Sequence, residues 1–418
     1  MSRRTLLAAL LAFVGAFTLL AAGCGGGGEE GEEGGGGGGG KTIKIVSDLP
    51  LQGSDRPQTE QMVRVIQFVL KQANNKAGAY TVQFQSYDDA TAAAGKWDEA
   101  KCSENARTFA GDESIVGVIG TYNSGCAAIE IPILNEVPLA MVSPANTYAG
   151  LTHEAPGTEE GEPDKYFPSG ERNYARVVAS DDNQGKIGAS YMKDKLGVTK
   201  VFILDDKELY GKGVADAFEA FAKEAGLQVV GHEGWDKDAP NYKALMTKIK
   251  AKGADGIYIG GISTNNGGQL IKDKVTVLGD NEQVKLLVSD GFVISSLFDE
   301  AGAQNVEGAY GTAPTLPTDQ VTGAGKKLLD AFTQAEGGKN IEVYTIYAAA
   351  AAQVFLDAVK RSDGSREDVL AKLKETNLGD TIVGPMSFDE NGDPKTKFET
   401  VYQAKGGEFV FVERKEVE

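Results

Sequence analysis

Histidine and cysteine are scarce in this 418-residue chain, which has only His153, His232 and three cysteines. Two histidines are too few for a histidine metal site, and they leave little to activate a cysteine nucleophile. The chain contains no G-x-S-x-G, H-E-x-x-H or C-x-x-C motif. Asp205 and Asp206 could serve as an acid and a base, but their place after a predicted strand favours a loop or capping role. These features argue against an enzyme.

Two segments approach ligand-binding motifs without completing them. GAGKK, which begins at Gly323, lacks the glycine that opens a phosphate loop and has no predicted strand before it. DENGD, at residues 389–393, is similar to a calcium loop, but its Gly392 stands fourth rather than sixth. An Asn-Gly hairpin turn explains this segment better. We therefore expect no cofactor and no metal.

Basic residues are outnumbered, with 42 lysines and arginines against 60 acidic residues and a formal net charge of −18 at pH 7. A nucleic-acid backbone needs a basic surface, so the charge argues against nucleic acid as a partner. Beyond Lys41 no apolar run approaches the length of a membrane span. We expect a soluble body that is large enough for two domains.

Residues 1–23 have the layout of a bacterial export signal peptide. Two arginines precede an apolar run at residues 6–20, which is short for a membrane span, and Ala-Ala-Gly follows. Cys24 comes next, and the arrangement resembles the lipobox of bacterial lipoproteins, in which the thiol receives diacylglycerol. The aliphatic residue usual three positions before the cysteine is Ala21 here. An ordinary secretory signal with an incidental cysteine is the alternative.

Glycine and glutamate make up all of residues 25–40. Such a segment cannot bury apolar surface, and as a flexible coil it would reach roughly 20–25 Å on average. The sequence therefore predicts a lipidated Cys24 and a tether, together residues 24–40, that hold the body at the outer face of the cell membrane.

The two remaining cysteines, Cys102 and Cys126, are an even pair in an exported chain, which favours a disulfide. Cys102 lies in a predicted helix, and Cys126 follows a predicted strand and turn. A bond between them would close a loop of about 25 residues, worth at most ~3.5 kcal/mol in the chain-entropy model. Two buried free thiols are the alternative.

Short β-rich segments alternate with amphipathic helical segments from Lys41 onward. The alternation predicts an α/β fold with parallel sheets covered by helices, in two units. The predicted helices include residues 126–135, 212–225 and 343–361. Ligands of such sheets bind beyond the carboxyl ends of the strands. The predicted loops at those ends are rich in hydrogen-bonding groups, and they are SDLPLQGSD, GTYNSG, SPANTYAG, LDDKELYGKG, GGISTNN and VSDGF.

Several motifs in order along the chain carry a family resemblance: VGVIGTYNSG, VPLAMVSPANT, DDNQG, ILDDKELYGKG, YIGG, LVSDG and VGPMSFDENGD. From Lys41 to the C-terminus the chain resembles the type I periplasmic binding proteins of the branched-chain amino acid (Leu/Ile/Val) ABC transport family. The resemblance implies two doubly wound parallel sheets in two lobes, joined by three hinge crossovers near Val178, Thr312 and Pro385. Lobe 1 would comprise 41–178 and 313–385, and lobe 2 would comprise 179–312 and 386–418.

The resemblance also implies a ligand site in the interlobe cleft. Ser124 would bind the ligand carboxylate together with the turn that contains Ala145, Asn146 and Thr147. Hydroxyl groups and N–H groups near helix starts suit an anion. Tyr210 would cover the backbone end of the ligand, and Asp290 would pair with its ammonium. Helix capping is the alternative for Ser124 and Thr147, loop packing for Tyr210, and a turn or cap for Asp290.

The chain departs from the family where the ligand side chain would lie. Ile262 replaces a family aromatic, the first cleft loop holds Ser54, Asp55 and Arg56, and Glu342 stands where leucine-type binders carry an apolar residue. These groups favour a polar or charged amino acid, or a short amide or urea-like compound. Solvated charges at the cleft rim are the alternative for Arg56 and Glu342.

The resemblance implies a monomeric solute-binding lipoprotein that delivers an amino acid or a small amide to an ABC permease. The alternative is a sensor that uses the same cleft and passes the signal to a different partner.

Overall fold

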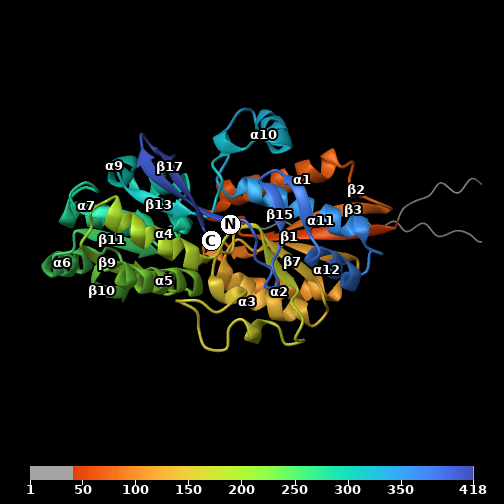
Figure 1. Ribbon diagram of the computed structural model, residues 1–418, viewed down its shortest axis with the longest axis horizontal. Helices are drawn as coiled ribbons and strands as arrows, with labels where there is room; N and C mark the ends of the chain where they lie inside the picture. The colour runs from red at the N-terminus through yellow and green to blue at the C-terminus, as the bar shows by residue number, and fades with distance from the viewer. Residues whose placement is uncertain (1–40, 418) are drawn as a thin grey trace, which may run out of the picture. The chain divides into compact units, whose positions relative to one another are not determined.

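The computed structural model describes residues 41–417, and the predicted signal peptide and Cys24 lie outside them. The first of two large sheets has strand order β2-β3-β1-β6-β7-β8 (Figure 1). Its strands are β1 (Thr42–Leu49), β2 (Lys76–Ala77), β3 (Tyr80–Asp88), β6 (Ile115–Gly120), β7 (Ala140–Ser143) and β8 (Tyr174–Arg176). All neighbouring pairs are parallel except β2–β3. Strands such as β6, IVGVIG, are buried throughout, as expected for a sheet with both faces covered.

The second large sheet has strand order β10-β9-β11-β12-β13-β16-β17. Its strands are β9 (Lys200–Asp205), β10 (Gln228–Gly234), β11 (Gly256–Gly260), β12 (Lys285–Val288), β13 (Tyr310–Ala313), β16 (Lys397–Lys405) and β17 (Glu408–Val417). The pairs are parallel as far as β13, and β16 and β17 add antiparallel strands at the edge. The connection between β16 and β17 is Gly406-Gly407, both at positive φ, and so short a turn can only return the chain antiparallel.

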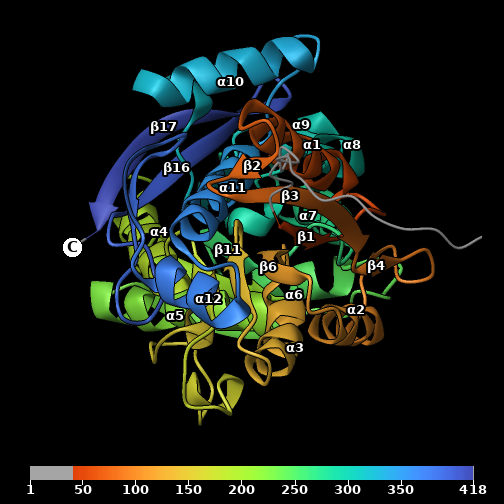
Figure 2. The same ribbon diagram turned by 90° about the vertical axis from the view of Figure 1, so that its right-hand side faces the viewer.

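Helices cover both faces of both sheets. They are α1 (Arg56–Gln72), α2 (Glu99–Gly111), α3 (Ser124–Asn135), α4 (Asp181–Asp194), α5 (Leu209–Ala225), α6 (Lys243–Lys252), α7 (Gly267–Leu278), α8 (Ser296–Ala301), α9 (Ala303–Val306), α10 (Gly323–Ala335), α11 (Thr345–Arg361) and α12 (Arg366–Lys374). Figures 1 and 2 show α1 and α11 on one side of β1, and α2 and α3 on the other. On the second sheet, α4 and α5 pack on one face and α6 and α7 on the opposite face. The fold is the predicted two-sheet α/β architecture.

Small elements complete the described chain. Two short hairpins are β4 (Ala90–Thr91) with β5 (Lys96–Trp97), and β14 (Asn377–Thr381) with β15 (Gly384–Ser387). Four 3-10 turns are η1 (Ala149–Leu151), η2 (Asp164–Tyr166), η3 (Asp290–Phe292) and η4 (Thr318–Gln320). Within residues 41–417, no helix combines the length and the apolar character needed to cross a membrane.

The chain passes between the two sheets three times. The chain leaves the first sheet after β8 and enters the second. It leaves the second sheet after β13 and returns to the second sheet between β15 and β16. The predicted crossover positions Val178 and Pro385 lie next to β8 and within β15, and Thr312 lies within β13. The exact lobe boundaries stay a prediction.

Helix α11 is the apolar centre of the first sheet. Residues 348–352 are five consecutive alanines, all fully buried, and a helix that is apolar all round belongs in a core. Phe355 on the same helix lies over Gly117 of β6, where an added Cβ would come within 2.3 Å of its ring. Close packing of small residues thus fixes α11 against the sheet, and it places Tyr344, the residue before the helix, at the end of the sheet where ligands bind.

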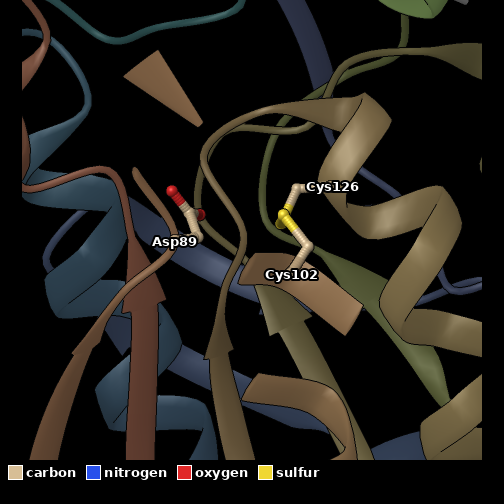
Figure 3. Close-up of side chains that lie close together, drawn as sticks. All are labelled: Asp89, Cys102 and Cys126. Carbon is tan, nitrogen blue, oxygen red and sulfur yellow. A yellow bond between two sulfur atoms is a disulfide. The ribbon is translucent and has the colours of Figure 1, made fainter. Parts of the chain in front are cut away.

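Cys102 of α2 and Cys126 of α3 form the predicted disulfide, with their Cα atoms 5.6 Å apart. Both residues are buried, and Asp89 lies beside them (Figure 3). Neither carboxylate oxygen of Asp89 has a hydrogen-bond partner among the described residues. Asp48 and Glu130 are buried nearby, and the Asn105 amide donates to Asp48 Oδ1 at 2.9 Å. Three buried carboxyl groups therefore surround the disulfide.

Burial raises the pKa of all three carboxyl groups, to about 8 for Glu130 and well above the usual range for Asp48 and Asp89. A carboxyl group with a raised folded-state pKa contributes stability that is complete below the unfolded pKa near 4 and is lost as the pH rises towards the folded value. We expect the free energy of unfolding to fall between pH 5 and pH 8, and Glu130→Gln to reduce that fall. Urea unfolding at several pH values measures it, with Glu136→Gln, an exposed carboxyl at the end of α3, as the control. Equal pH slopes for wild type and Glu130→Gln would contradict this account.

Candidate functional site

The topology of each sheet creates a crevice where neighbouring connections leave in opposite directions. In the first sheet β1 lies between β3 and β6, so the chain leaves β1 towards one edge and β6 towards the other. In the second sheet β9 lies between β10 and β11 in the same way. Such switch points are where open parallel sheets bind ligands. The segments that follow β1, β6, β9 and β11 contain half of the ten predicted ligand-binding residues.

A small cavity lies between these loops. It is lined by Tyr122, Asn123, Ser124, Ala145, Thr147, Tyr210, Ile262, Asp290, Gly291 and Tyr344. The structure thus brings six predicted residues together at one cavity: Ser124, Ala145, Thr147, Tyr210, Ile262 and Asp290. Asn146, Ser54, Asp55 and Glu342 do not line it.

One end of the cavity is the N-terminus of α3. Ser124 is the first residue of this helix, two residues earlier than the predicted start at Cys126, and no side chain in the described part of the chain caps the N-terminus. Unpaired N–H groups and the helix dipole make such an end favourable for an anion. Among residues 41–417, the Ser124 hydroxyl accepts only a long hydrogen bond, 3.5 Å, from the Tyr148 N–H. Thr147 is buried beside it, so two hydroxyl groups and a helix start lie at this end.

The turn after β7 was predicted to bind the ligand carboxylate, but the N–H groups of Ala145 and Asn146 are bonded within the loop itself. The Ser143 hydroxyl accepts from the N–H groups of Ala145 and Asn146, at 3.1 and 2.8 Å. The Asn146 side chain donates to the Tyr122 carbonyl at 3.0 Å and accepts from the Tyr174 hydroxyl at 3.1 Å. Asn146 therefore braces the loop, and it offers the cavity neither its amide side chain nor a free N–H.

Asp290 is the charged group at the other end of the cavity. It begins η3, one residue beyond the end of β12, and is 6% exposed. The Gln184 amide donates to Oδ1 at 2.7 Å, the Tyr344 hydroxyl donates to Oδ2 at 2.6 Å, and the Tyr210 hydroxyl also donates to Oδ1. Burial raises the pKa of Asp290, and these hydrogen bonds oppose the shift.

Tyr344 is a cavity residue that the sequence analysis missed. It precedes α11 on the first sheet, whereas Asp290 belongs to the second, so their hydrogen bond closes the space between the sheets. Its ring packs edge-on against Tyr122, 6.0 Å between centroids, and the Tyr122 hydroxyl accepts from the Gln58 amide at 2.6 Å. The available signal was the segment EVYTIYAA at the start of a predicted helix, in which two tyrosines precede an alanine run.

Asp181 is a second buried carboxyl group that the sequence analysis did not assign. It is 1% exposed, its Oδ2 has no partner among the described residues, and burial raises its pKa well above the usual range. The Gln184 amide donates to Asp181 Oδ1 at 3.0 Å as well as to Asp290. The Thr312 hydroxyl and the Asp290 N–H donate to Gln184 Oε1, at 2.9 and 3.0 Å, so the orientation of this amide is fully set. Asp181 is one of the two aspartates that open the DDNQG motif.

The helices next to Tyr210 and Glu342 begin at other residues than the sequence predicted. Helix α5 begins at Leu209 rather than at residue 212, so Tyr210 is in its first turn and the rigid helix holds its hydroxyl on Asp290. Helix α11 begins at Thr345 rather than at residue 343, so Glu342 lies before it and accepts from the Ser295 hydroxyl. Arg56 is exposed, and its Nε lies 2.6 Å from Glu60 Oε1. This position matches the alternative interpretation of Arg56 as a solvated charge at the rim.

In the described part of the chain, three groups of side chains lie close enough together to hold a metal ion, and each has another explanation. Two of the three candidate groups include sulfur atoms of Cys102 or Cys126, which are bonded to each other. The third is His232 with Asp216 and Glu219. Its geometry fits ion pairing, because His232 Nδ1 lies 2.7 Å from Glu219 Oε2 and Nε2 lies 3.3 Å from an Asp205 oxygen.

A site with a helix N-terminus at one end and a buried carboxylate at the other, set between two α/β sheets, is a binding geometry. The chain matches the family model described as periplasmic binding protein over residues 42–408. The chain belongs to the periplasmic binding protein family. Members of this family are extracytoplasmic substrate-binding proteins of transporters rather than enzymes.

Relatives of this periplasmic binding protein include the Leu/Ile/Val-binding protein homolog 2 of Brucella abortus. The two are 30% identical over 362 residues, which cover 86% of this chain and 89% of that relative. Among solved structures, the leucine binding protein LivK of Thermotoga maritima superposes with a TM-score of 0.75 at 22% identity, covering 89% of this chain and 98% of that one. LivJ of Streptococcus pneumoniae, in complex with isoleucine, has a TM-score of 0.75 at 21% identity, covering 90% and 99%.

Proposed function

We propose that this protein binds an α-amino acid in the cavity between its sheets and delivers it to an ABC permease. The observation that carries the proposal is the polarity of the cavity. The uncapped start of α3 with Ser124 and Thr147 suits a carboxylate, and the buried Asp290 carboxylate suits an ammonium. The names of the relatives, which bind leucine, isoleucine and valine, support an amino acid as the ligand class.

Tyr344 and Tyr210 would control the access of a ligand ammonium to the Asp290 carboxylate. In this structure their hydroxyl groups occupy the carboxylate that an ammonium would need, and the Tyr344 contact comes from the opposite sheet. Opening the two lobes about their connections would break the Tyr344–Asp290 bond and admit a ligand, and closure would trap it. The ammonium would then replace at least one hydroxyl donor at Asp290.

Identification of the ligand tests this proposal directly. Protein purified without refolding is denatured, and the released small molecules are identified by mass spectrometry. Calorimetry with the free compound then measures its affinity. We expect an α-amino acid that is recovered unaltered. Failure of every α-amino acid to bind, together with release of a compound that has no amino acid backbone, would overturn the proposal.

We further propose that Cys24 is lipidated and that residues 24–40 tether the binding body close to its permease. A tether of this length keeps the body at a high effective concentration near a membrane partner. The support is the lipobox-like arrangement around Cys24 and the Gly/Glu composition that follows it.

Cys24→Ser is expected to move the protein from the membrane fraction to the soluble or secreted fraction, because it removes the thiol that would carry the lipid. Fractionation with immunodetection, and labelling with a fatty acid analogue, measure both effects. Gly28→Ser, which alters the tether and keeps the thiol, serves as the matched control and should stay membrane-bound. An unchanged membrane level of Cys24→Ser would rule out the anchor and leave the cavity assignment intact.

A further inference from the structure

A second polar set lies beside the cavity, where the loop after β1 meets α8 and the loop after β11. It consists of Ser54, Asp55, Ser263 and Glu300, called here the acidic subsite. Ser263 directly follows Ile262, which lines the cavity. The hydroxyls of Ser54, Ser296 and Ser263 all lie close enough to the Glu300 carboxylate to lower its pKa, but the Ser263 and Ser296 hydroxyls complete no hydrogen bond among the described residues. Ser54 belongs to the first sheet and Glu300 to the second, so the subsite spans the same interlobe space as the cavity.

Asp55 occupies a helix-capping position without capping the helix. It is the N-cap residue of α1, where an aspartate normally accepts from the first-turn N–H groups, yet its side chain makes no such bond. It is 1% exposed, and its Oδ2 has no hydrogen-bond partner among the described residues. A buried carboxylate oxygen that is turned away from available donors requires another partner.

The other members of the subsite are also short of donors. Ser263 is 1% exposed and its hydroxyl has no partner, and Glu300 Oε1 is buried without one, both within residues 41–417. Leaving a buried polar atom unpaired is costly, and the cost is greater for a charged group. The Ser263 hydroxyl can donate or accept, but the Asp55 and Glu300 carboxylate oxygens can only accept, so these orphaned atoms from both sides of one interlobe space indicate a missing group that can donate at least two hydrogen bonds.

The charge balance of the subsite shows what that group should be. Burial and the charge of Glu300 raise the pKa of Asp55, to about 7. Lys96 is the cation that acts on Asp55, but its ammonium is already held by Glu208 and by Asn265 Oδ1, the latter at 2.6 Å. The charge of Lys272 has only a minor effect on Glu300, and no ion pair within residues 41–417 joins Asp55 or Glu300 to a lysine or arginine. Lobe closure therefore brings two carboxyl groups together without a paired cation.

We propose that the acidic subsite binds a cationic group at the end of the ligand side chain, so that the preferred ligand is an α-amino acid with a second ammonium or a guanidinium. This inference rests on the proposed function. A neutral side chain would leave Asp55 and Glu300 facing each other on closure, and like charges resist such an approach. A cation placed between them would reverse that repulsion and supply the missing donors. Selectivity would thus arise from the closed state, where the subsite is assembled from both lobes.

Calorimetry with matched pairs of amino acids tests the inference. Lysine and norleucine share a carbon chain and differ in the terminal ammonium, and arginine and citrulline differ chiefly in charge. We expect the better bound of lysine and arginine to bind at least tenfold more tightly than its neutral partner. Asp55→Asn and Glu300→Gln should each reduce that ratio to about threefold or less, because each weakens binding of the cation and removes the repulsion that opposes binding of norleucine. Glu60→Gln, a surface carboxyl on α1 that pairs with Arg56, is the control and should preserve the ratio.

The outcomes separate the two proposals. Tight binding of leucine or norleucine, with neither lysine nor arginine favoured over its neutral partner, would overturn the acidic subsite and leave the proposed amino acid function standing. A cation preference that survives both Asp55→Asn and Glu300→Gln would likewise overturn it. Failure of every amino acid to bind would overturn both proposals.

Discussion

Asp393→Ala is expected to lower the free energy of unfolding by about 3–5 kcal/mol, because it leaves a buried guanidinium without its counter-charge. Arg176, the last residue of β8, is fully buried, and its Nε donates to Asp393 Oδ1 at 2.5 Å. Its Nη1 donates to the carbonyls of Tyr148 and Asn146, at 2.8 and 3.2 Å. These carbonyls hold the side chain in place, and Asp393 is the carboxylate that pairs with it directly, with a smaller contribution from the charge of Asp181.

The Arg176–Asp393 pair also links parts of the chain that connect the two lobes. Asp393 lies in the connection between β15 and β16, and Arg176 lies where the chain leaves the first sheet, so the pair joins two of the three interlobe connections. His153 Nδ1 lies 2.9 Å from Asp393, and its Nε2 lies 3.6 Å from Asp182 at the start of α4. Burial opposes protonation, but hydrogen bonds to Asp182 and Asp393 raise the pKa of His153 to about 9.

Chemical denaturation monitored by circular dichroism measures the effect of Asp393→Ala. Glu390→Ala, which removes an exposed carboxyl from the same turn, is the control and should change stability by less than about 0.5 kcal/mol. The double variant Arg176→Leu/Asp393→Leu should recover part of the loss, because it removes both buried charges together. A loss below about 1 kcal/mol in Asp393→Ala would show that the pair is not the anchor described here.

Asp290→Ala is expected to weaken amino acid binding by about 2–5 kcal/mol, roughly 30- to 4,000-fold in Kd, since it leaves the ligand ammonium buried and unpaired. The effect should be seen for every α-amino acid that the protein binds, because Asp290 would contact the part they share. Calorimetry with the ligand found by mass spectrometry measures it, after circular dichroism has confirmed that the variant is folded.

Tyr344→Phe provides the matched control for Asp290. It removes one hydroxyl donor from the carboxylate and keeps the ring that packs on Tyr122. Affinity should therefore stay within about tenfold of wild type or improve, because the ammonium no longer displaces this hydroxyl. Unchanged affinity in Asp290→Ala, or a loss in Tyr344→Phe as large as in Asp290→Ala, would remove Asp290 from its assigned role.

Local sequence patterns predicted the strands and helices, and they predicted which edge of the sheets lies at the cavity. The alternation of β-rich and helical segments predicted both sheets, and parallel strands bring their carboxyl ends to one edge. For this reason loops of one sheet, such as those of Ser124 and Thr147, could be grouped from the sequence, whereas grouping Ser124 with Asp290 of the other sheet depended on the family resemblance. The Cys102–Cys126 pair was likewise predictable, from cysteine count and export. Asn146 could not be judged in this way, because its hydrogen bonds to Tyr122 and Tyr174 depend on how three loops pack.

By itself, the sequence determined the α/β class and the order of the main strands and helices, because these depend on periodicity, turn residues and chain order. It favoured the Cys102–Cys126 disulfide over two free thiols and predicted polar loops at the strand ends. Only the tertiary structure decided which side chains meet across the two sheets. Tyr344 reaches Asp290, and Ser54 reaches Glu300, through packing between segments that no local pattern relates. The burial that raises the pKa of Asp55 and leaves its Oδ2 unpaired also arises only when both lobes are in place, since desolvation is a property of the assembled fold.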